Sequence, residues 1–556
     1  MAEQRRKKEK NFLVQGSILA IAGVITKIIG AVYRIPLTNI AGAEGIGYYS
    51  VAFSIYSVAL MLTSYSLPLA VSKLVSARVA VGEYRNAYKV FKGAMTFALL
   101  AGGFVSLLIF LGADFIASHI MHMDMSAYAL RVLAPCILIV ALLGVLRGFF
   151  QGNGSMVPTA ISQVVEQVVN AVASIAGAYF LLQAGKSIAE TRGKKSYGPA
   201  YAAAGGTVGT VAGALAALLF VALIFYAYKR IFKRQMKRDR TRRRESYKKI
   251  YKILFITIAP VILSATVYNI SDFIDTAMFN NIMAAQGFKK VEYAELLGMF
   301  GGQYTTMINV PLSISSALAA SLIPSLVATV QTGNRKQIHN KINMVSRFNM
   351  LIAIPCAVGF VILAKPLLDL LYFTQDNTKP ALMLQLGALS VVFFCLSTVT
   401  NSVLQGLDDM MTPVRNAAIS LVIHVIALFL MMVVFKWNIY AVVLSKIVFS
   451  GASCILNAHS LRERIGYVQE RKKTFVIPAI AATVMGVVAI VVHLLFELFA
   501  GARIATVVAV LAAMVVYGAV LVLLGGVTEE ELLDMPKGAS VASLCRKLHL
   551  LRGQYR

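Results

Sequence analysis

Two basic residues lie inside an apolar stretch near the N-terminus of this sequence. Residues 24–37 read VITKIIGAVYRIPL and contain Lys27 and Arg34. Because seven residues make almost two helical turns, both cations would share one helix face, roughly 10 Å apart along the axis. A cation in the middle of a bilayer costs at least ~2.5 kcal/mol on insertion scales. The pair would suit an anion, since arginine offers phosphate oxygens a planar fork and lysine a point charge.

Other apolar stretches are also interrupted by polar residues. These are Lys73, Gln163, Glu166, Gln167, Asn170, Asn269, Asp272, Asp275, Gln303 and Asn309. Those between 163 and 170, and those between 269 and 275, recur every three or four residues, which places each set on one helix face. Facing lipid they would be costly, so we expect them to line an interior, hydrated cavity. The carboxylates there could bind a coupling cation or proton, or hold a lysine when the site is empty.

Each of these residues also has a purely structural interpretation. Arg34 could extend to the headgroups at the outer end of its helix, and Lys73 could be an orientation charge near the cytoplasmic end. Lys27 could form an ion pair with Asp272 or Asp275. The polar stripe between 163 and 170 could supply hydrogen bonds between helices. The sequence leaves both interpretations open.

The composition is that of a membrane protein. Of 556 residues, 58% are hydrophobic and only 14% are charged, whereas a soluble domain is about 25% charged. The apolar segments are too long for barrel strands and lack their alternation, which predicts an all-α polytopic membrane protein with about 14 transmembrane helices. The predicted spans are 12–35, 46–71, 91–117, 128–148, 158–183, 200–228, 251–281, 296–330, 344–372, 381–404, 413–436, 438–460, 474–499 and 502–526.

The distribution of basic residues predicts how the chain is oriented. The formal net charge is +28, but the cations flank apolar runs, which favours orientation signals and contacts with anionic lipids over nucleic acid. The connections 36–47 and 113–127 contain no Lys or Arg, whereas thirteen lie between 229 and 252. Alternation of this kind predicts that both termini are cytoplasmic. One connection, 184–199, is an exception because its four cations would lie outside.

The sequence contains two pairs of similar segments that indicate an internal repeat. FFQGNGSMVP (149–158) and VLQGLDDMMTP (403–413) share a Gln-Gly pair, a methionine and a proline that opens a helix, and SLPLAVSKLVSA (66–77) weakly resembles SALAASLIPSLVA (316–328). We interpret this as two parallel six-helix repeats followed by two C-terminal helices, a recurrent transporter plan. The predicted domains are an N-terminal lobe (1–228), a basic cytoplasmic linker (229–250), a C-terminal lobe (251–460), and a segment with the last two helices and the tail (461–556).

Signatures of catalysis are missing from the sequence. It contains neither H-E-x-x-H nor G-x-S-x-G, and its five cysteines are scattered without a C-x-x-C pair. We therefore expect no metal site, no cofactor and no enzymatic activity. If the protein moves a substrate, the energy must come from an ion gradient, the membrane potential or the flux of the substrate itself.

Several stretches resemble a known family. YRIPL (33–37), GAEGIGYYSVAFSIYS (42–57), LPLAVSKLVSA (67–77) and IDTAMF (274–279) resemble the polysaccharide exporters of the multidrug/oligosaccharidyl-lipid/polysaccharide superfamily. Within it the chain is most similar to the MurJ-type lipid II flippases of the Gram-positive branch and to stage V sporulation protein B. The resemblance implies two lobes around an alternating-access cavity, and a groove for the polyprenyl tail on the last two helices. It implies transfer of an undecaprenyl-diphosphate-linked cell-wall precursor between leaflets of a bacterial cell membrane.

The resemblance also bears on the site residues. The family's basic residues of the first helix correspond best to Lys27 and Arg34. Gram-negative members carry an arginine near Thr306, which this sequence lacks, and Lys73 is a candidate substitute. Four rival functions stay open: a flippase for another lipid-linked oligosaccharide, a cation-coupled multidrug antiporter of the same superfamily, a scaffold that recruits cell-wall enzymes, and an integral-membrane glycosyltransferase.

Overall fold

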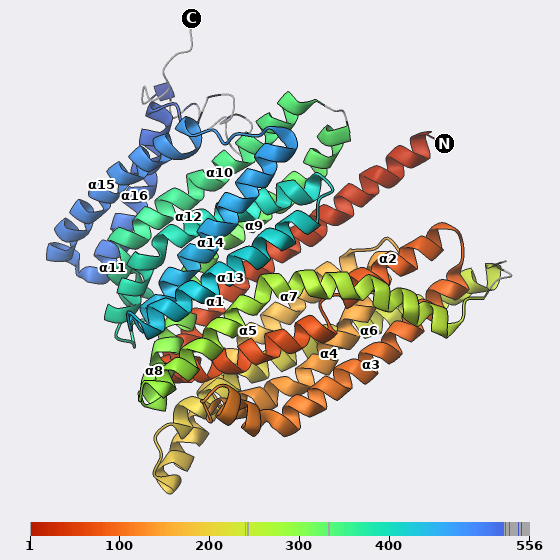
Figure 1. Ribbon diagram of the computed structural model, residues 1–556, viewed down its shortest axis with the longest axis horizontal. Coiled ribbons are helices and arrows are strands. Elements are labelled where there is room, and N and C mark those ends of the chain that lie inside the picture. The colour runs from red at the N-terminus through yellow and green to blue at the C-terminus, as the bar shows by residue number, and fades with distance from the viewer. Residues whose placement is uncertain are drawn as a thin grey trace, which may run out of the picture. The chain divides into compact units, whose positions relative to one another are not determined.

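The chain folds into helices throughout the part that the structure describes (Figure 1). The computed structural model describes residues 2–239, 241, 244–331 and 334–527, with five further positions in the C-terminal tail. Contacts group these residues into two compact units. The first comprises residues 1–302 and 429–439, and the second comprises residues 303–428 and 440–556.

The first unit is a bundle of long helices with short connections. Its helices are α1 (Ala2–Thr63), α2 (Leu67–Ala80), α3 (Tyr84–Phe115), the π-helix η1 (Ile116–Ile120), α4 (Ser126–Gly152), α5 (Val157–Arg192), α6 (Tyr197–Arg238), α7 (Tyr247–Ala285) and α8 (Lys290–Gly298), followed by the start of a second π-helix, η2 (Met299–Tyr304).

The second unit continues from η2. Its helices are α9 (Thr305–Gln331), α10 (Arg335–Ile362), α11 (Ala364–Leu371), α12 (Thr378–Gly406), most of α13 (Met411–Val433), α14 (Ile439–Ile465), the π-helix η3 (Lys472–Val476), α15 (Ile477–Ala500) and α16 (Ala502–Leu523). Helices α15 and α16 pack against each other, and α15 also packs against α10.

The helices confirm the predicted all-α polytopic membrane class. Eleven stretches in the described residues are long and apolar enough to cross a bilayer. One of them, Ile21–Ala80, contains the kinked α1 together with α2. Two further helices, α7 and α9, have 39 and 27 residues. The predicted lobe boundaries at 228, 250 and 460 describe an internal duplication. Grouping by contacts does not test a duplication, so those boundaries stay a prediction.

The predicted connection between the first two spans is much shorter in the structure than in the prediction. Residues 36–47 were expected to form the connection between the first two predicted spans. The chain instead stays helical through Pro36 and breaks only at Gly42, whose φ of 72° and ψ of 171° suit a residue without a side chain. A membrane helix tolerates an internal proline, because neighbouring groups satisfy the freed backbone.

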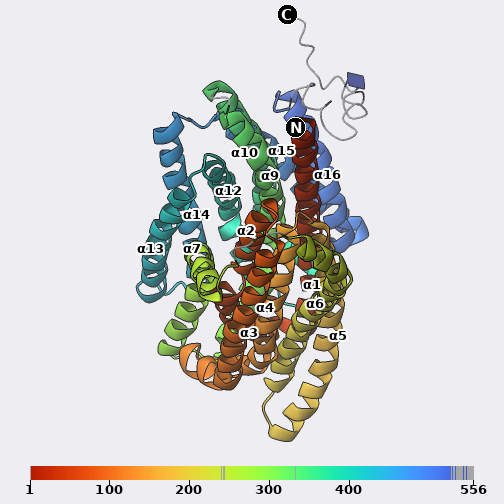
Figure 2. The same cartoon turned by 90° about the vertical axis from the view of Figure 1, so that its right-hand side faces the viewer.

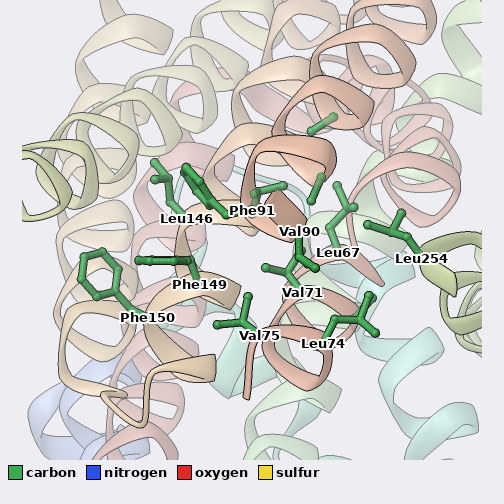
Figure 3. Packing of buried hydrophobic residues seen from close by; sticks show 14 of the residues in the cluster. Leu67, Val71, Leu74, Val75, Val90, Phe91, Leu146, Phe149, Phe150 and Leu254 are labelled. Carbon is green, nitrogen blue, oxygen red and sulfur yellow. The ribbon is translucent and has the colours of Figure 1, made fainter. Parts of the chain in front are cut away.

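A hydrophobic core of the first unit lies between α2, α3, α4, α6 and α7, and Figure 3 shows part of it. Leu67, Val71, Leu74 and Val75 form one face of α2 at helical spacing and are all buried. They meet aromatic rings from α3 and α4, among them Phe149, whose side chain is fully buried. In a bilayer, packing of this kind holds helices together mainly by van der Waals contact, since lipid tails are equally apolar.

The two Gln-Gly turns make the same kind of contact in their own units. In the first unit, a β-carbon on Gly152 would lie 2.7 Å from the Val75 side chain of α2. In the second unit, a β-carbon on Gly406 would lie 2.9 Å from the Leu326 side chain of α9. Val75 and Leu326 belong to residues 66–77 and 316–328, the second pair of similar segments in the sequence. The predicted repeat therefore extends from sequence to packing at this position.

Candidate functional site

A close contact between two helices positions the start of η2. In the first unit, a β-carbon on Gly47 would collide with the carbonyl of Ala294, and one on Gly298 would collide with the carbonyl of Ala43. The backbones of α1 and α8 therefore touch, as small residues allow in membrane helices. Gly301 follows directly in η2, and π-helical turns of this kind are frequent at functional sites.

Arg34 lies against this π-helix. Its Nη1 donates to the carbonyl oxygen of Gly301 at 3.4 Å, and its guanidinium carbon lies 5.7 Å from the ring centre of Tyr49. The ring face attracts a cation, and the contact strengthens away from water. Tyr49 in turn stacks on Phe53 at 5.6 Å. Arg34 is half-buried in the structure, so its guanidinium is held by the protein.

The polar stripe of α5 contacts neighbouring helices. Asn170 donates to the hydroxyl of Tyr33 on α1 at 3.4 Å and accepts from Ser174 at 3.0 Å. Ser174 also donates to the carbonyl of Gly206 on α6 at 2.8 Å. Asn170 therefore acts as a hydrogen-bonded link between helices, the structural interpretation that the sequence had left open for this stripe.

Glu166 of the same stripe forms an ion pair that the sequence analysis missed. Arg147 of α4 donates its Nη2 to Glu166 Oε2 at 2.8 Å and its Nε to the hydroxyl of Ser162 at 2.9 Å. The sequence did contain a feature that could have indicated this ion pair, because Arg147 lies at the end of the apolar run 128–148. In this conformation Glu166 is engaged by an arginine of its own unit, which reduces its suitability as a binder of a coupling cation.

The other predicted cations of the first unit are exposed. The side chains of Lys27 on α1 and Lys73 on α2 are both exposed, whereas Arg34 is half-buried. The predicted polar residues on α7 differ in their burial. Asp275 is buried, with 3% of its surface exposed, while Asn269 and Asp272 are exposed.

The two predicted site residues beyond 302 belong to the second unit. Gln303 is buried and donates through Nε2 to Asn377 Oδ1 at 2.5 Å. Asn377 donates to Asp369 Oδ1 at 2.8 Å and to the carbonyl of Tyr372 at 3.0 Å. Gln303 is thereby tied to the loop before α12. Asn309 on α9 is exposed. Among the described residues, no group of three or more His, Cys, Asp or Glu side chains is arranged to hold a metal ion.

A comparison with protein-family models decides the family. Residues 12–330, more than half of the chain, match the model for polysaccharide biosynthesis proteins. The chain belongs to this family. The matched region contains residues 12–302 of the first unit, and therefore Arg34, the α5 stripe and the start of η2.

Curated members related to this polysaccharide biosynthesis family protein include two from Bacillus subtilis (strain 168). The lipid II flippase MurJ is 26% identical over 427 residues, which cover 74% of this chain and 75% of the relative. Stage V sporulation protein B is 33% identical over 199 residues, which cover 35% and 36% of the two chains. Both relatives were expected from the sequence resemblance.

Two solved structures share the fold of this polysaccharide biosynthesis family protein. The lipid II flippase MurJ in an inward closed conformation matches with a TM-score of 0.62 at 15% identity, covering 90% of this chain and 97% of the other. An inward-facing MATE-family multidrug resistance transporter of the MOP superfamily also matches with a TM-score of 0.62 at 15% identity, covering 80% and 98%. The fold is therefore that of the predicted superfamily.

Proposed function

We propose that this protein is a flippase for an undecaprenyl-diphosphate-linked cell-wall precursor, most simply lipid II. The observation that carries the proposal is Arg34, a half-buried arginine in the middle of a membrane helix, held by the Gly301 carbonyl and the Tyr49 ring. The relationship to a protein named lipid II flippase over three quarters of both chains supports the choice of substrate.

The geometry of Arg34 suits a diphosphate. A guanidinium has five N–H donors, and Gly301 accepts from only one nitrogen at a long 3.4 Å. The remaining donors can bind two phosphate oxygens side by side. Lys27 lies two helical turns earlier on the same helix and is exposed, so it adds a second positive charge for the same group. Lys73 is a third candidate in our proposal.

The precursor has a polar head and a long apolar tail, and each needs a different surface. The head would bind the cations of α1, while the tail stays in lipid. The exposed apolar side chains of α15 and α16, among them Leu498, Phe499 and Val515, suit contact with acyl or polyprenyl chains. Alternating access would then carry the head between leaflets without a catalytic step.

The coupling of transport to an energy source is also a proposal. Asp272 and Asp275 lie one turn apart on α7 and are our candidates for a coupling cation or proton. Glu166 is a weaker candidate, because Arg147 already neutralises it. The membrane potential is an alternative source. We further propose that both termini are cytoplasmic and that the basic connection 229–252 contacts anionic lipids.

A multidrug antiporter is the second candidate, favoured by the equally good match to a MATE-family transporter. Such a protein would need an acidic, aromatic cavity for cationic drugs. The aromatic cluster is present at Tyr49 and Phe53, but the charge beside it is the positive Arg34. Drug resistance upon overexpression would favour the antiporter over the flippase.

The test is the accessibility of lipid II in each leaflet. Cells depleted of their own flippase should accumulate lipid II on the inner leaflet, and this protein should restore its exposure on the outer leaflet. Arg34→Ala should fail to restore it at normal expression. A matched control is Arg131→Ala, because Arg131 is an exposed arginine of the same unit in a surface ion pair with Asp114. Restoration by Arg34→Ala equal to that by the control would overturn the proposal.

A further inference from the structure

One cavity of the second unit lies where α15 passes into α16. The two helices lie side by side (Figures 1 and 2) and are joined at Gly501. With 24 and 22 residues, each is about as long as a bilayer is thick, so their joined ends lie at headgroup level. The cavity has a volume of about 420 Å³ and is lined by these two ends, by α11 and by the end of α10. Its volume is typical of a small-molecule site.

The lining of this cavity combines apolar and charged side chains. Ile490 and Leu494 of α15 contribute apolar surface and are both exposed. The acidic and basic residues of the lining are Lys365, Asp369, Glu497 and Arg503. Two of them are positive and two are negative, so their formal charges cancel. A lining with both signs beside apolar surface suits a zwitterionic, amphipathic ligand better than a simple ion.

Only one pair of these opposite charges meets. Lys365 Nζ lies 2.9 Å from Asp369 Oδ2, and Asn377 donates to the other carboxylate oxygen at 2.8 Å. Arg503 and Glu497 line the same cavity but form no ion pair with each other in the part of the chain that the structure describes. The Arg503 guanidinium instead lies 5.6 Å from the ring centre of Phe373. This contact uses the charge but leaves the N–H donors of the guanidinium for an acceptor in the cavity.

His493 places a second acceptor beside Glu497. Its side chain is buried, and its Nε2 lies 3.2 Å from Thr506 Oγ1. Because Thr506 donates its only hydroxyl proton to the carbonyl of Ala502 at 2.7 Å, the imidazole Nε2 has to donate to Thr506. A neutral ring then has a lone pair at Nδ1, 3.6 Å from Glu497 Oε2. Two neighbouring acceptors are best satisfied by a donor between them, and a primary ammonium has three N–H groups to donate.

We propose that this cavity binds a phospholipid whose headgroup carries a primary ammonium. The ammonium donates to Glu497 and His493, the phosphate accepts from the planar fork of Arg503, and the acyl chains lie along Leu494. A quaternary ammonium has no N–H donor and a glycerol headgroup has no cation, so the site discriminates against both. The cavity lies wholly in the second unit, whereas Arg34 belongs to the first. The proposal therefore does not rest on the proposed transport activity.

Native mass spectrometry of the full-length protein in detergent, titrated with one phospholipid at a time, tests this proposal. The probes are phosphatidylethanolamine, phosphatidylcholine and phosphatidylglycerol with identical acyl chains. We expect wild type to bind phosphatidylethanolamine at least about tenfold more tightly than the other two, since one charge-assisted hydrogen bond accounts for such a factor. The pocket variant, Glu497→Gln with Arg503→Gln, should lose this preference. The matched control, Arg462→Gln with Glu463→Gln, removes one exposed charge of each sign from α14, outside the cavity, and should keep it.

Single variants separate the two contacts. Glu497→Gln should reduce the affinity for phosphatidylethanolamine to that for phosphatidylcholine, whereas Arg503→Gln should weaken the binding of all three lipids. Arg34→Ala should keep the preference, and no step measures transport, so failure of the flippase proposal would leave the result unaffected. Equal binding of phosphatidylethanolamine and phosphatidylcholine by wild type would refute the site and show that a proton on His493 Nδ1 already satisfies Glu497. A preference for phosphatidylglycerol, or an equal loss in the pocket and control variants, would refute it as well.

Discussion

Arg147 of α4 and Glu166 of α5 form an ion pair across the helix interface of the first unit. Arg147 Nη2 lies 2.8 Å from Glu166 Oε2, and both side chains are largely buried, with 14% and 25% of their surfaces exposed. A second bond from Arg147 Nε to Ser162 orients the guanidinium. Because each partner neutralises the other, both charges can be placed inside a membrane-spanning bundle, where a lone charge would be costly.

The first prediction removes one partner of this pair. Glu166→Gln leaves Arg147 without its carboxylate, and loss of one partner of a buried pair costs about 3–5 kcal/mol. We expect a lower thermal midpoint of the detergent-purified protein, and Arg147→Ala should lower it similarly. The exchanged pair, Arg147→Glu with Glu166→Arg, should recover part of the loss. If the exchanged protein is no more stable than either single variant, the pair does not act as an ion pair.

The helices could be predicted because the hydropathy pattern that specifies each helix lies within its own residues. Long apolar runs with basic ends predicted the spans of the fold without knowledge of partners. The errors lie where an apolar run crosses a backbone break. The predicted segment 344–372 contains most of α10 and all of α11, which are separated at Leu363. Hydropathy does not register such a break, and it likewise gave no sign that α1 stays helical through Pro36.

The site was less predictable, because its partners come from other helices. The spacing of Glu166 and Asn170 correctly predicted a shared polar face of α5. Which group meets each of them depends on how α1 and α4 are rotated against α5, and one sequence does not contain that rotation. Arg147 was missed for this reason. The hydrogen bond from Arg34 to the Gly301 carbonyl could not be predicted either, since every residue has a backbone carbonyl and the residue type does not reveal which one will accept.

The second prediction concerns the glycine contact between α1 and α8. Gly298→Val would place a branched side chain against the carbonyl of Ala43, so the two helices must separate. We expect the separation to move η2 and lower transport, because Gly301 would leave Arg34. Gly103→Val is a control on α3, since nothing lies within 4 Å of a β-carbon there. Lipid II accessibility at matched expression checks the outcome. Equal transport by both variants would show that the contact does not support the site.

The third prediction concerns Glu245, an acidic residue in the basic connection between α6 and α7. Glu245 accepts from Arg78 Nε of α2 at 2.7 Å, and its backbone carbonyl accepts from Lys89 of α3 at 2.9 Å. These bonds tie the connection to the helices. Arg78→Ala should release it and speed cleavage by trypsin within 229–252 several-fold. Lys73→Ala, which removes an exposed cation of the same helix, should leave the cleavage rate unchanged. Equal rates in both variants would argue against this attachment.

The same connection has a defined pH dependence. Burial would raise the pKa of Asp239, but hydrogen bonds from Thr241 and from the backbone of Arg85 outweigh burial and hold the pKa below its ordinary value. A lowered carboxyl pKa stabilises the folded form above the ordinary pKa, and this stabilisation is lost as the pH falls through the lowered value. Hydrogen exchange of the Arg85 amide should therefore stay protected at neutral pH, and only strong acid should reduce the protection. Loss of protection already near pH 6 would contradict this assignment.

The last prediction separates the shape of Arg34 from its charge. Arg34→Lys keeps the positive charge but removes the planar fork, so it should bind a diphosphate through fewer hydrogen bonds. Each lost charge-assisted bond is worth about 1.5–3 kcal/mol, which predicts transport at least ~tenfold below wild type. Arg34→Ala and Lys27→Ala should abolish growth of cells depleted of their native flippase, at normal expression. Full growth with Arg34→Ala would reject the role of this arginine, whereas growth with Arg34→Lys equal to wild type would reject the fork and retain the charge.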